Sequence, residues 1–150
     1  MLRKAKLKDV KKIQALVNYY ACKNLMLARS LNEIYENLRD FWVYEKNNKI
    51  LGCAALHLIG WENLVEIKSL AVEKQLRHKS VGRDLVLACL EEAKSLGAKK
   101  AFVLTYIPDY FKKLGFKKTT HAKLPHKIWA ECIYCAKFPN CNEIAMIRQL

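Results

Sequence analysis

The sequence predicts an α/β fold, with a mixed sheet of about six to seven strands flanked by about four helices. Residues 64–105 read as strand, helix and strand, and such a crossover pairs its two strands in parallel. Residues 41–59 place two apolar stretches around Asn47-Asn48, which is typical of an antiparallel hairpin. A sheet that holds both pairings is mixed. Because 150 residues are the usual size of one domain, we expect a single domain over residues 1–150.

The N-terminal half begins with a short strand at residues 1–6 and a helix at residues 10–27, where apolar positions recur at helical spacing. Ser30 is placed to cap the next helix, which runs to about residue 39. Glu33, three residues later, completes a capping-box pattern. The hairpin follows, with strands at 41–45 and 50–59.

The C-terminal half contains the clearest helix, residues 81–96, which Gly97 ends. Pro108 opens a short helix that Gly115 ends. Residues 122–141 show no clear period. The remaining elements of this half are expected strands at 64–72, 101–105, 116–118 and 142–150.

Composition and charge narrow the classes of function. Apolar residues make up 52% of the chain, but no apolar run approaches the roughly 18 residues of a membrane span. The charged N-terminus does not read as a secretory signal, so we expect a cytoplasmic protein without a membrane partner. The net charge of +13 suits polyanionic partners, namely nucleic acid, acidic lipid or a phosphorylated cofactor, but a solvated lysine-rich surface is the favoured interpretation and charge alone selects no function. Because the lysines are scattered and not interleaved with aromatic residues, nucleic acid is not the favoured partner. The oligomeric state is left open, a homodimer included.

A basic helix start follows the apolar strand that ends at Val72. Unpaired backbone N–H groups and a partial positive charge at a helix N-terminus suit a pyrophosphate. Gly82 lets the backbone approach such a ligand closely, whereas the alternative is an exposed basic turn that binds nothing. The residues of this loop are Arg77, His78, Lys79, Ser80, Val81, Gly82 and Arg83.

This segment resembles the acetyl-CoA-binding motif of the GNAT superfamily of N-acetyltransferases, with Arg77, Ser80 and Gly82 on its three defined positions and Ser80 in place of a glycine. The order of elements along the whole chain is also similar to that family. The resemblance implies acetyl-CoA as co-substrate, with the pyrophosphate held by residues 78–83 and the pantetheine arm by the backbone of Leu70, Ala71 and Val72.

Acetyl transfer needs a neutral amine and hence a group that removes a proton from the ammonium form. Strict alternation along residues 64–72 puts Glu66, Lys68 and Leu70 on one face of the strand. Glu66 falls where several GNAT enzymes carry a catalytic glutamate, and the resemblance makes the Leu70 backbone N–H the donor to the oxyanion. The alternative for Glu66 and Lys68 is a plain ion pair.

Many GNAT enzymes carry a tyrosine that protonates the leaving thiolate, four residues before the glycine of a late Gly-Phe pair. That position is Phe111 in this chain, and Phe cannot donate a proton. Tyr110 would point about 100° away on a helix. The general acid is therefore unassigned, and a CoA thiol leaves tolerably without one.

The acceptor is indicated by two other stretches. The segment Met26 to Ser30 and the tail from Leu124 to Met146 resemble the short, single-domain N-acetylglutamate synthases of arginine biosynthesis. The resemblance implies L-glutamate as acceptor. Its two carboxylates suit Arg29, which can bind one in a bidentate fork, and Lys68, while the alternative for Arg29 is a surface residue near a helix cap. The alternatives are another small amine or a protein N-terminus, and a non-catalytic module that binds acetyl-CoA or nucleic acid.

Five of the six cysteines fall into two groups, and Cys22 stands outside both. Cys53 and Cys89 lie in apolar segments and are expected to be inert core residues. A second group gives the spacing H-x5-C-x2-C-x5-C, which leaves a structural zinc ion as an alternative that is not favoured over packed thiols or a Cys135–Cys141 disulfide. Its residues are His126, Cys132, Cys135 and Cys141.

Overall fold

The computed structural model describes residues 1–59, 63–76, 79–124, 132–135 and 141–150. In these ranges the chain forms one sheet of seven strands in the order β1-β2-β3-β4-β5-β7-β6, and four α-helices accompany it. Both numbers agree with the sequence prediction. The strands are β1 (Leu2–Lys4), β2 (Phe41–Lys46), β3 (Lys49–Leu58), β4 (Leu64–Val72), β5 (Lys100–Thr105), β6 (Lys117–Lys118) and β7 (Ile144–Gln149). The helices are α1 (Val10–Ala21), α2 (Leu31–Glu36), α3 (Val81–Ser95) and α4 (Pro108–Lys112).

The sheet is mixed, as predicted, because β4 and β5 are parallel and the other described pairs are antiparallel. The β2–β3 hairpin turns at Asn47 and Asn48, whose φ angles are 51° and 60°. Left-handed values at both central residues are what a type I′ turn requires, and asparagine tolerates them. The turn pair therefore performs the role that the sequence predicts.

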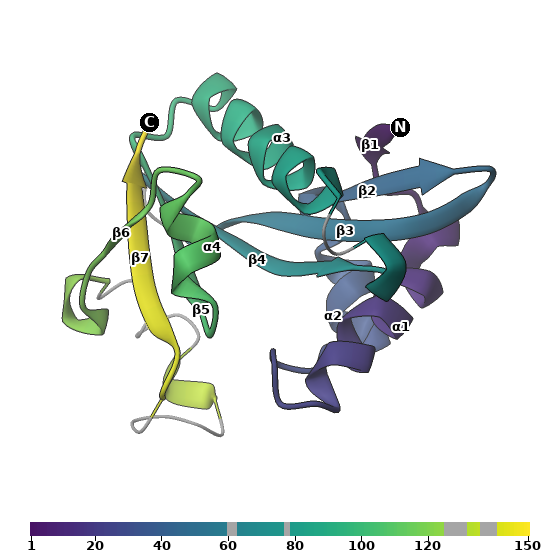
Figure 1. Ribbon diagram of the computed structural model, residues 1–150, viewed down its shortest axis with the longest axis horizontal. Coiled ribbons are helices and arrows are strands. Elements are labelled where there is room, and N and C mark those ends of the chain that lie inside the picture. Colours follow the sequence, from purple (N-terminus) through teal and green to yellow (C-terminus); the bar gives the residue numbers. More distant parts are fainter. Residues whose placement is uncertain (60–62, 77–78, 125–131, 136–140) are drawn as a thin grey trace.

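Helices cover both faces of the sheet (Figure 1). The apolar side of α1, from Val10 to Tyr20, packs with Ile34 of α2 and with Cys53 and Ala55 of β3. On the other face, α3 and α4 cover the large apolar cluster that includes Leu56 and Phe116. Because successive side chains of a strand point to opposite faces of the sheet, neighbouring residues of β3 contribute to different clusters.

The helix ends differ from the sequence prediction in one place that matters for the site. Helix α1 ends at Ala21, because Lys23 N–H and Leu25 N–H both bond the carbonyl of Tyr20 and Asn24 turns with φ of 58°. Residues 25–29, of which 25–27 were predicted to be helical, form a loop instead. Ser30 caps α2 as predicted, accepting the N–H of Glu33 at 3.1 Å.

Strands β4 and β5 stay paired over only three residues, from Leu64↔Lys100 to Glu66↔Phe102. Beyond Glu66 the two strands diverge, as Figure 1 shows, and β5 continues its pairing with β7 alone. The sheet therefore opens between its two parallel strands. No helix in the described ranges has the length and apolar character that crossing a membrane requires.

Candidate active site

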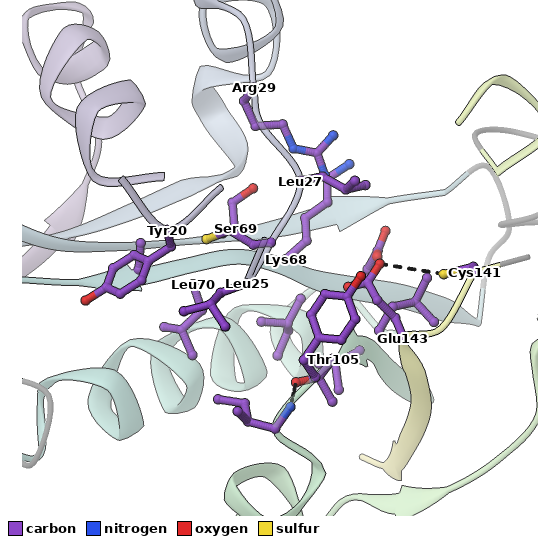
Figure 2. A pocket seen from close by; sticks show the side chains of 18 of the residues that line it. Tyr20, Leu25, Leu27, Arg29, Lys68, Ser69, Leu70, Thr105, Cys141 and Glu143 are labelled. Atoms are coloured by element: carbon purple, nitrogen blue, oxygen red, sulfur yellow. Dashed lines mark hydrogen bonds between the residues drawn. The ribbon is translucent and has the colours of Figure 1, made fainter. Parts of the chain in front are cut away.

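A cavity of about 970 Å³ lies where the sheet opens. Its walls come from the loop after α1, from β4, from the end of β5 with α4, and from the C-terminal segment. The lining includes Met26, Arg29, Glu66, Lys68, Leu70, Val72, Gly82, Thr105, Tyr110 and Glu143 (Figure 2). The opening thus collects most of the residues that the sequence predicts for catalysis and acceptor binding.

Strand β4 carries a bulge at the centre of this cavity. Cys53↔Ala71 and Ala55↔Lys68 are partners across β3 and β4, so β4 has one residue more than β3 between these pairs. Ser69 takes up the extra residue with φ of 56°, a left-handed value uncommon for a residue other than glycine. Such bulges often adjoin active sites, where they redirect side chains.

The bulge corrects one prediction. Strict alternation would put Leu70 on the face of Glu66 and Lys68, but Leu70 packs against the α3 cluster that contains Ile67. Ala71 lies instead in the cluster under α1. The added residue therefore reverses the two faces of β4 beyond Ser69, which a period of two cannot predict.

The open side of β4 presents backbone groups to the cavity. Glu73 N–H bonds the carbonyl of Leu51, and the next pair, Gly52↔Val72, then points its peptide groups away from β3. The Val72 carbonyl is already engaged, because the hydroxyl of Tyr20 donates a hydrogen bond to it. The Val72 N–H is therefore directed to the open side, and α1 is tied to the end of β4.

Glu66 is the most buried carboxylate on the cavity wall, with 3% of its surface exposed. It lies at the last residue pair of β4 with β5, opposite Phe102. Lys68 is two residues further along β4, opposite Ala55 of β3 and half-buried. The structure therefore brings the two together on one face at the point where the sheet opens, as predicted.

Arg29 reaches the same cavity from the loop before α2. Its backbone is fixed to α1, because Asn18 Oδ1 accepts the Arg29 N–H at 3.1 Å and the Gln14 amide donates to its carbonyl at 3.2 Å. Its Nη1 lies 3.4 Å from the Glu33 carboxylate, while its buried Nε has no hydrogen-bond partner among the residues that the structure describes. Figure 2 shows the guanidinium and the Lys68 side chain pointing toward one another from opposite walls. A buried donor without a partner suits an anionic ligand.

The phosphate loop is described from Lys79 onward, so Arg77 and His78 lie outside the described residues. Ser80 takes φ of −73°, so serine fits here without the strain of a positive φ. Its side chain makes no capping bond to the described residues of α3. Lys79, Ser80 and Arg83 are exposed at the start of α3, whereas the Val81 side chain is buried and can offer only its backbone N–H.

The position where many GNAT enzymes carry a catalytic tyrosine has apolar surroundings in this structure. Phe111 is buried and makes an edge-to-face contact with Phe116 at 5.6 Å. Tyr110 points elsewhere, toward Gly82 at the start of α3, and burial there raises the pKa of its hydroxyl. A neutral tyrosine thus lines the cavity beside the phosphate loop. The sequence did not predict this position, because helical spacing showed only that Tyr110 and Phe111 point in different directions.

The cysteine group lies along the cavity without forming a metal centre among the described residues. Cys132, Cys135 and Cys141 are of intermediate exposure and form no disulfide with one another, and Cys141 Sγ lies 3.8 Å from a Glu143 carboxylate oxygen. His126, the fourth residue of the predicted pattern, lies outside the described residues. Cys53 and Cys89 are buried in the core, and burial raises the pKa of each thiol to about 12, as expected for inert residues.

A sheet opened between two parallel strands, with a bulged strand and a basic helix start at the opening, defines the class of protein as an acyl-transfer enzyme of the acetyltransferase type. Residues 8–116 match the Acetyltransferase (GNAT) family. The chain belongs to this family and is an acetyl-CoA-dependent N-acetyltransferase.

Related sequences agree with this membership. An uncharacterized N-acetyltransferase of Chlorobaculum tepidum is 37% identical over 149 residues, which cover 99% of this chain and 96% of that protein. An amino-acid acetyltransferase of Mycobacterium tuberculosis is 32% identical over 134 residues, 87% of this chain and 76% of the relative. An amino-acid acetyltransferase of Pseudomonas aeruginosa is 30% identical, but the match covers 83% of this chain and only 29% of that protein.

Solved structures confirm the fold. The Rv2747 protein of Mycobacterium tuberculosis, in complex with CoA and NLQ, superposes with a TM-score of 0.85 at 29% identity, over 100% of this chain and 99% of that one. The N-acetylglutamate synthase of Neisseria gonorrhoeae, complexed with CoA and N-acetyl-glutamate, superposes with a TM-score of 0.91 at 24% identity. That match covers 100% of this chain and 35% of the Neisseria chain. At 24% identity it supports the fold alone.

Proposed function

We propose that residues 1–150 act as one acetyltransferase domain that transfers the acetyl group of acetyl-CoA to the α-amine of L-glutamate, the first step of arginine biosynthesis. The observation that carries the choice of acceptor is the buried Nε of Arg29 on the cavity wall, a donor without a partner in the described part of the chain. The two named relatives that are amino-acid acetyltransferases, at 32% and 30% identity, support an amino acid as acceptor.

Glutamate suits this cavity because it carries two carboxylates and the cavity offers two cations. Arg29 is the partner for one carboxylate, since a guanidinium can hold both of its oxygens. Lys68, which points toward Arg29 from β4, is the partner for the other. An acceptor held at both ends would present its amine to the stretch of β4 that contains Glu66. Glu33, which contacts Arg29 Nη1, keeps the guanidinium in place before the acceptor binds.

Acetyl-CoA is proposed to lie in the opening between β4 and β5. The Val72 N–H on the open side of β4 suits an amide of the pantetheine arm, together with the backbone of Leu70 and Ala71. The N–H groups that begin α3, from Val81 to Arg83, suit the pyrophosphate, with added charge from Lys79 and Arg83 and a hydroxyl from Ser80. Arg77 and His78 belong to the same proposed loop.

The reaction then needs two proton transfers from the acceptor nitrogen and one displacement. Glu66 takes a proton from the bound ammonium group, directly or through a water molecule, and leaves a neutral amine. The amine attacks the thioester carbonyl, and the Leu70 N–H stabilises the oxyanion of the tetrahedral intermediate. The C–S bond breaks, and the leaving CoA thiolate takes up the proton that the nitrogen of the intermediate loses, so the amide and CoA-SH form without a tyrosine at the position of Phe111. No covalent enzyme intermediate forms.

The test is release of free CoA thiol from acetyl-CoA with a panel of amines: glutamate, glutamine, aspartate, ornithine, lysine, spermidine and a short peptide. We expect turnover with glutamate, a rate reduced roughly 10²–10⁴-fold by Glu66→Gln, and a higher KM for glutamate in Arg29→Ala. A blank without amine corrects for hydrolysis and for the six protein thiols. Turnover with another amine alone would discard glutamate as the acceptor while keeping the enzyme class.

A further inference from the structure

The proposed reaction releases one proton in every turnover. An ammonium acceptor and acetyl-CoA give the amide, CoA-SH and H⁺, so the proton that Glu66 receives must reach water before the next cycle. Glu66 is only 3% exposed, and its route to water through the cavity is the space that both substrates occupy. A second route, away from the cavity, would let the base reset while ligands are bound.

The sheet register places a histidine beside this base. His57 of β3 is the direct partner of Glu66 in the antiparallel pairing of β3 with β4. Side chains of directly opposite residues lie on the same face, with Cβ atoms about 4.5–5.5 Å apart. His57 is 20% exposed and is not part of the cavity lining that the described residues form. It therefore lies between the buried base and solvent.

A second carboxylate, that of Asp40, contacts the His57 ring. His57 Nδ1 lies 2.7 Å from Asp40 Oδ2, at the end of the 3₁₀ turn Leu38–Asp40. A carboxylate at Nδ1 favours the tautomer that carries its proton there, so that Nε2 is the basic ring nitrogen. Asp40 is 23% exposed, so the line from Glu66 through His57 to Asp40 runs from the buried site to the surface.

We propose that His57, positioned by Asp40, carries the proton from Glu66 to solvent. The proton on the Glu66 carboxyl moves to Nε2 of His57, which regenerates the carboxylate and forms an imidazolium that Asp40 stabilises. The imidazolium then releases one proton to water and returns to the neutral ring. This inference rests on the proposed role of Glu66 and holds for any ammonium acceptor, since the balance does not depend on the rest of that molecule.

The charged groups around His57 are few in the part of the chain that the structure describes. Glu66 faces it from β4 and Asp40 from the turn before β2. Lys68 follows two residues after Glu66 on the same face of β4, opposite Ala55. The described charges that face His57 are therefore two carboxylates and one ammonium group.

The experiment compares two variants with a matched control. His57→Asn keeps an N–H donor for Asp40 but cannot take up a proton. Asp40→Asn removes the charge that stabilises the imidazolium. Leu58→Asn, at the next residue of β3, adds the same side chain at a position that is 57% exposed and on the other face. Initial rates with acetyl-CoA and L-glutamate are measured from about pH 6 to about pH 9, at low and high imidazole concentration and against a blank without enzyme.

We expect His57→Asn to lower kcat about tenfold at neutral pH, with both KM values unchanged, and imidazole in the buffer to restore part of the rate. Asp40→Asn should move the acid limb of the kcat profile to lower pH, because the imidazolium loses its partner. Leu58→Asn should match wild type. A His57→Asn enzyme with wild-type kcat at every pH and no response to imidazole would overturn the relay. Should that variant fail to fold, an unshifted Asp40→Asn profile has the same meaning.

The proposed function and the proton relay can be tested separately in the same series of variants. If glutamate is not acetylated but another amine of the panel is, the rates are measured with that amine, because the relay concerns the ammonium proton. If Glu66→Gln retains full kcat, Glu66 is not the base and both proposals fail together. If Glu66→Gln is slow and His57→Asn is not, the proposed function stands and the relay is wrong.

Discussion

A Cβ atom at Gly82 would stand 2.7 Å from the hydroxyl oxygen of Tyr110, closer than atoms pack in proteins. The same Cβ would lie 3.7 Å from the ring carbon that bears this hydroxyl, which is ordinary contact. The position of Tyr110 on α4 thus disfavours a side chain at Gly82, in addition to any approach of a ligand to the backbone.

This relationship predicts that Gly82→Ala destabilises the protein by about 1–3 kcal/mol, the usual cost of forcing a methyl group into a packed site. Tyr110→Phe removes the clashing atom, so Gly82→Ala should cost much less in a Tyr110→Phe background. Urea unfolding of the four proteins in a double-mutant cycle measures the coupling. Additive effects would show that the tyrosine moves aside freely.

Arg29 is predicted to bind the acceptor and not the co-substrate. Arg29→Lys keeps a cation but loses the planar fork, so the KM for glutamate should rise about tenfold while the KM for acetyl-CoA stays unchanged. Arg39→Lys is the matched control, because Arg39 is exposed and is not among the described residues of the cavity wall. Steady-state kinetics with each substrate varied in turn decide the matter. Equal changes in both KM values would contradict the assignment.

Acid should weaken the contact between β1 and the start of α1. Arg3 lies 2.7 Å from the buried Asp9 and 3.0 Å from Glu45. Burial alone raises the pKa of Asp9, but the hydrogen bonds from Arg3 and from the Lys6 N–H lower it overall. The stabilisation is therefore complete above the unfolded pKa of about 3.9 and is lost as the pH falls through the lower folded pKa.

Arg3→Met should accordingly cost about 3 kcal/mol at neutral pH, because it leaves the Asp9 carboxylate buried and unpaired. Its free energy of unfolding should also fall less steeply than that of wild type below about pH 4. Urea unfolding at a series of pH values gives both quantities. Parallel pH curves for the two proteins would mean that Arg3 does not set the pKa of Asp9.

The six cysteines should divide into two classes by reactivity. Cys22 is exposed and Cys132, Cys135 and Cys141 are of intermediate exposure, so four thiols should react with Ellman's reagent in the native protein at about pH 8. Cys53 and Cys89 should react only after unfolding, since burial raises the pKa of each to about 12. Zinc content measured on the same sample provides the check. One bound zinc ion per chain together with fewer reactive thiols would restore the metal alternative.

Most of the fold follows from the sequence because its signals are local. The hairpin turn at Asn47-Asn48, the Ser30 cap and the α3 helix that Gly97 ends each depend on a few neighbouring residues, and the structure confirms them. The end of α1 was predicted too late, because apolar residues continue to Leu27 while the chain has already turned at Asn24. Those apolar residues line the cavity instead of continuing the helix.

The sequence predicted which residues form the site better than it predicted how they are arranged. The motif at the start of α3, Glu66 and Arg29 were assigned from their resemblance to known acetyltransferases, and alternation along β4 grouped Lys68 with Glu66. Gly82 of the motif and these three residues do lie along one cavity. The bulge at Ser69 could not be predicted from the sequence. The pairing of β4 with β3 imposes the left-handed conformation of this serine, which leaves no local signal. The Tyr20 hydroxyl on Val72 and the His57 partner of Glu66 likewise depend on register between distant segments.

A single competition reaction tests the proposed function most directly. Acetyl-CoA is added to an equimolar mixture of glutamate, glutamine, aspartate, ornithine and lysine, and the acetylated products are identified by mass spectrometry, since product ratios report relative kcat/KM values. The account predicts N-acetylglutamate as the main product, depleted when Arg29→Lys or Glu66→Gln replaces wild type. Another acetylated amino acid as the main product, or N-acetylglutamate unaffected by both substitutions, would contradict it.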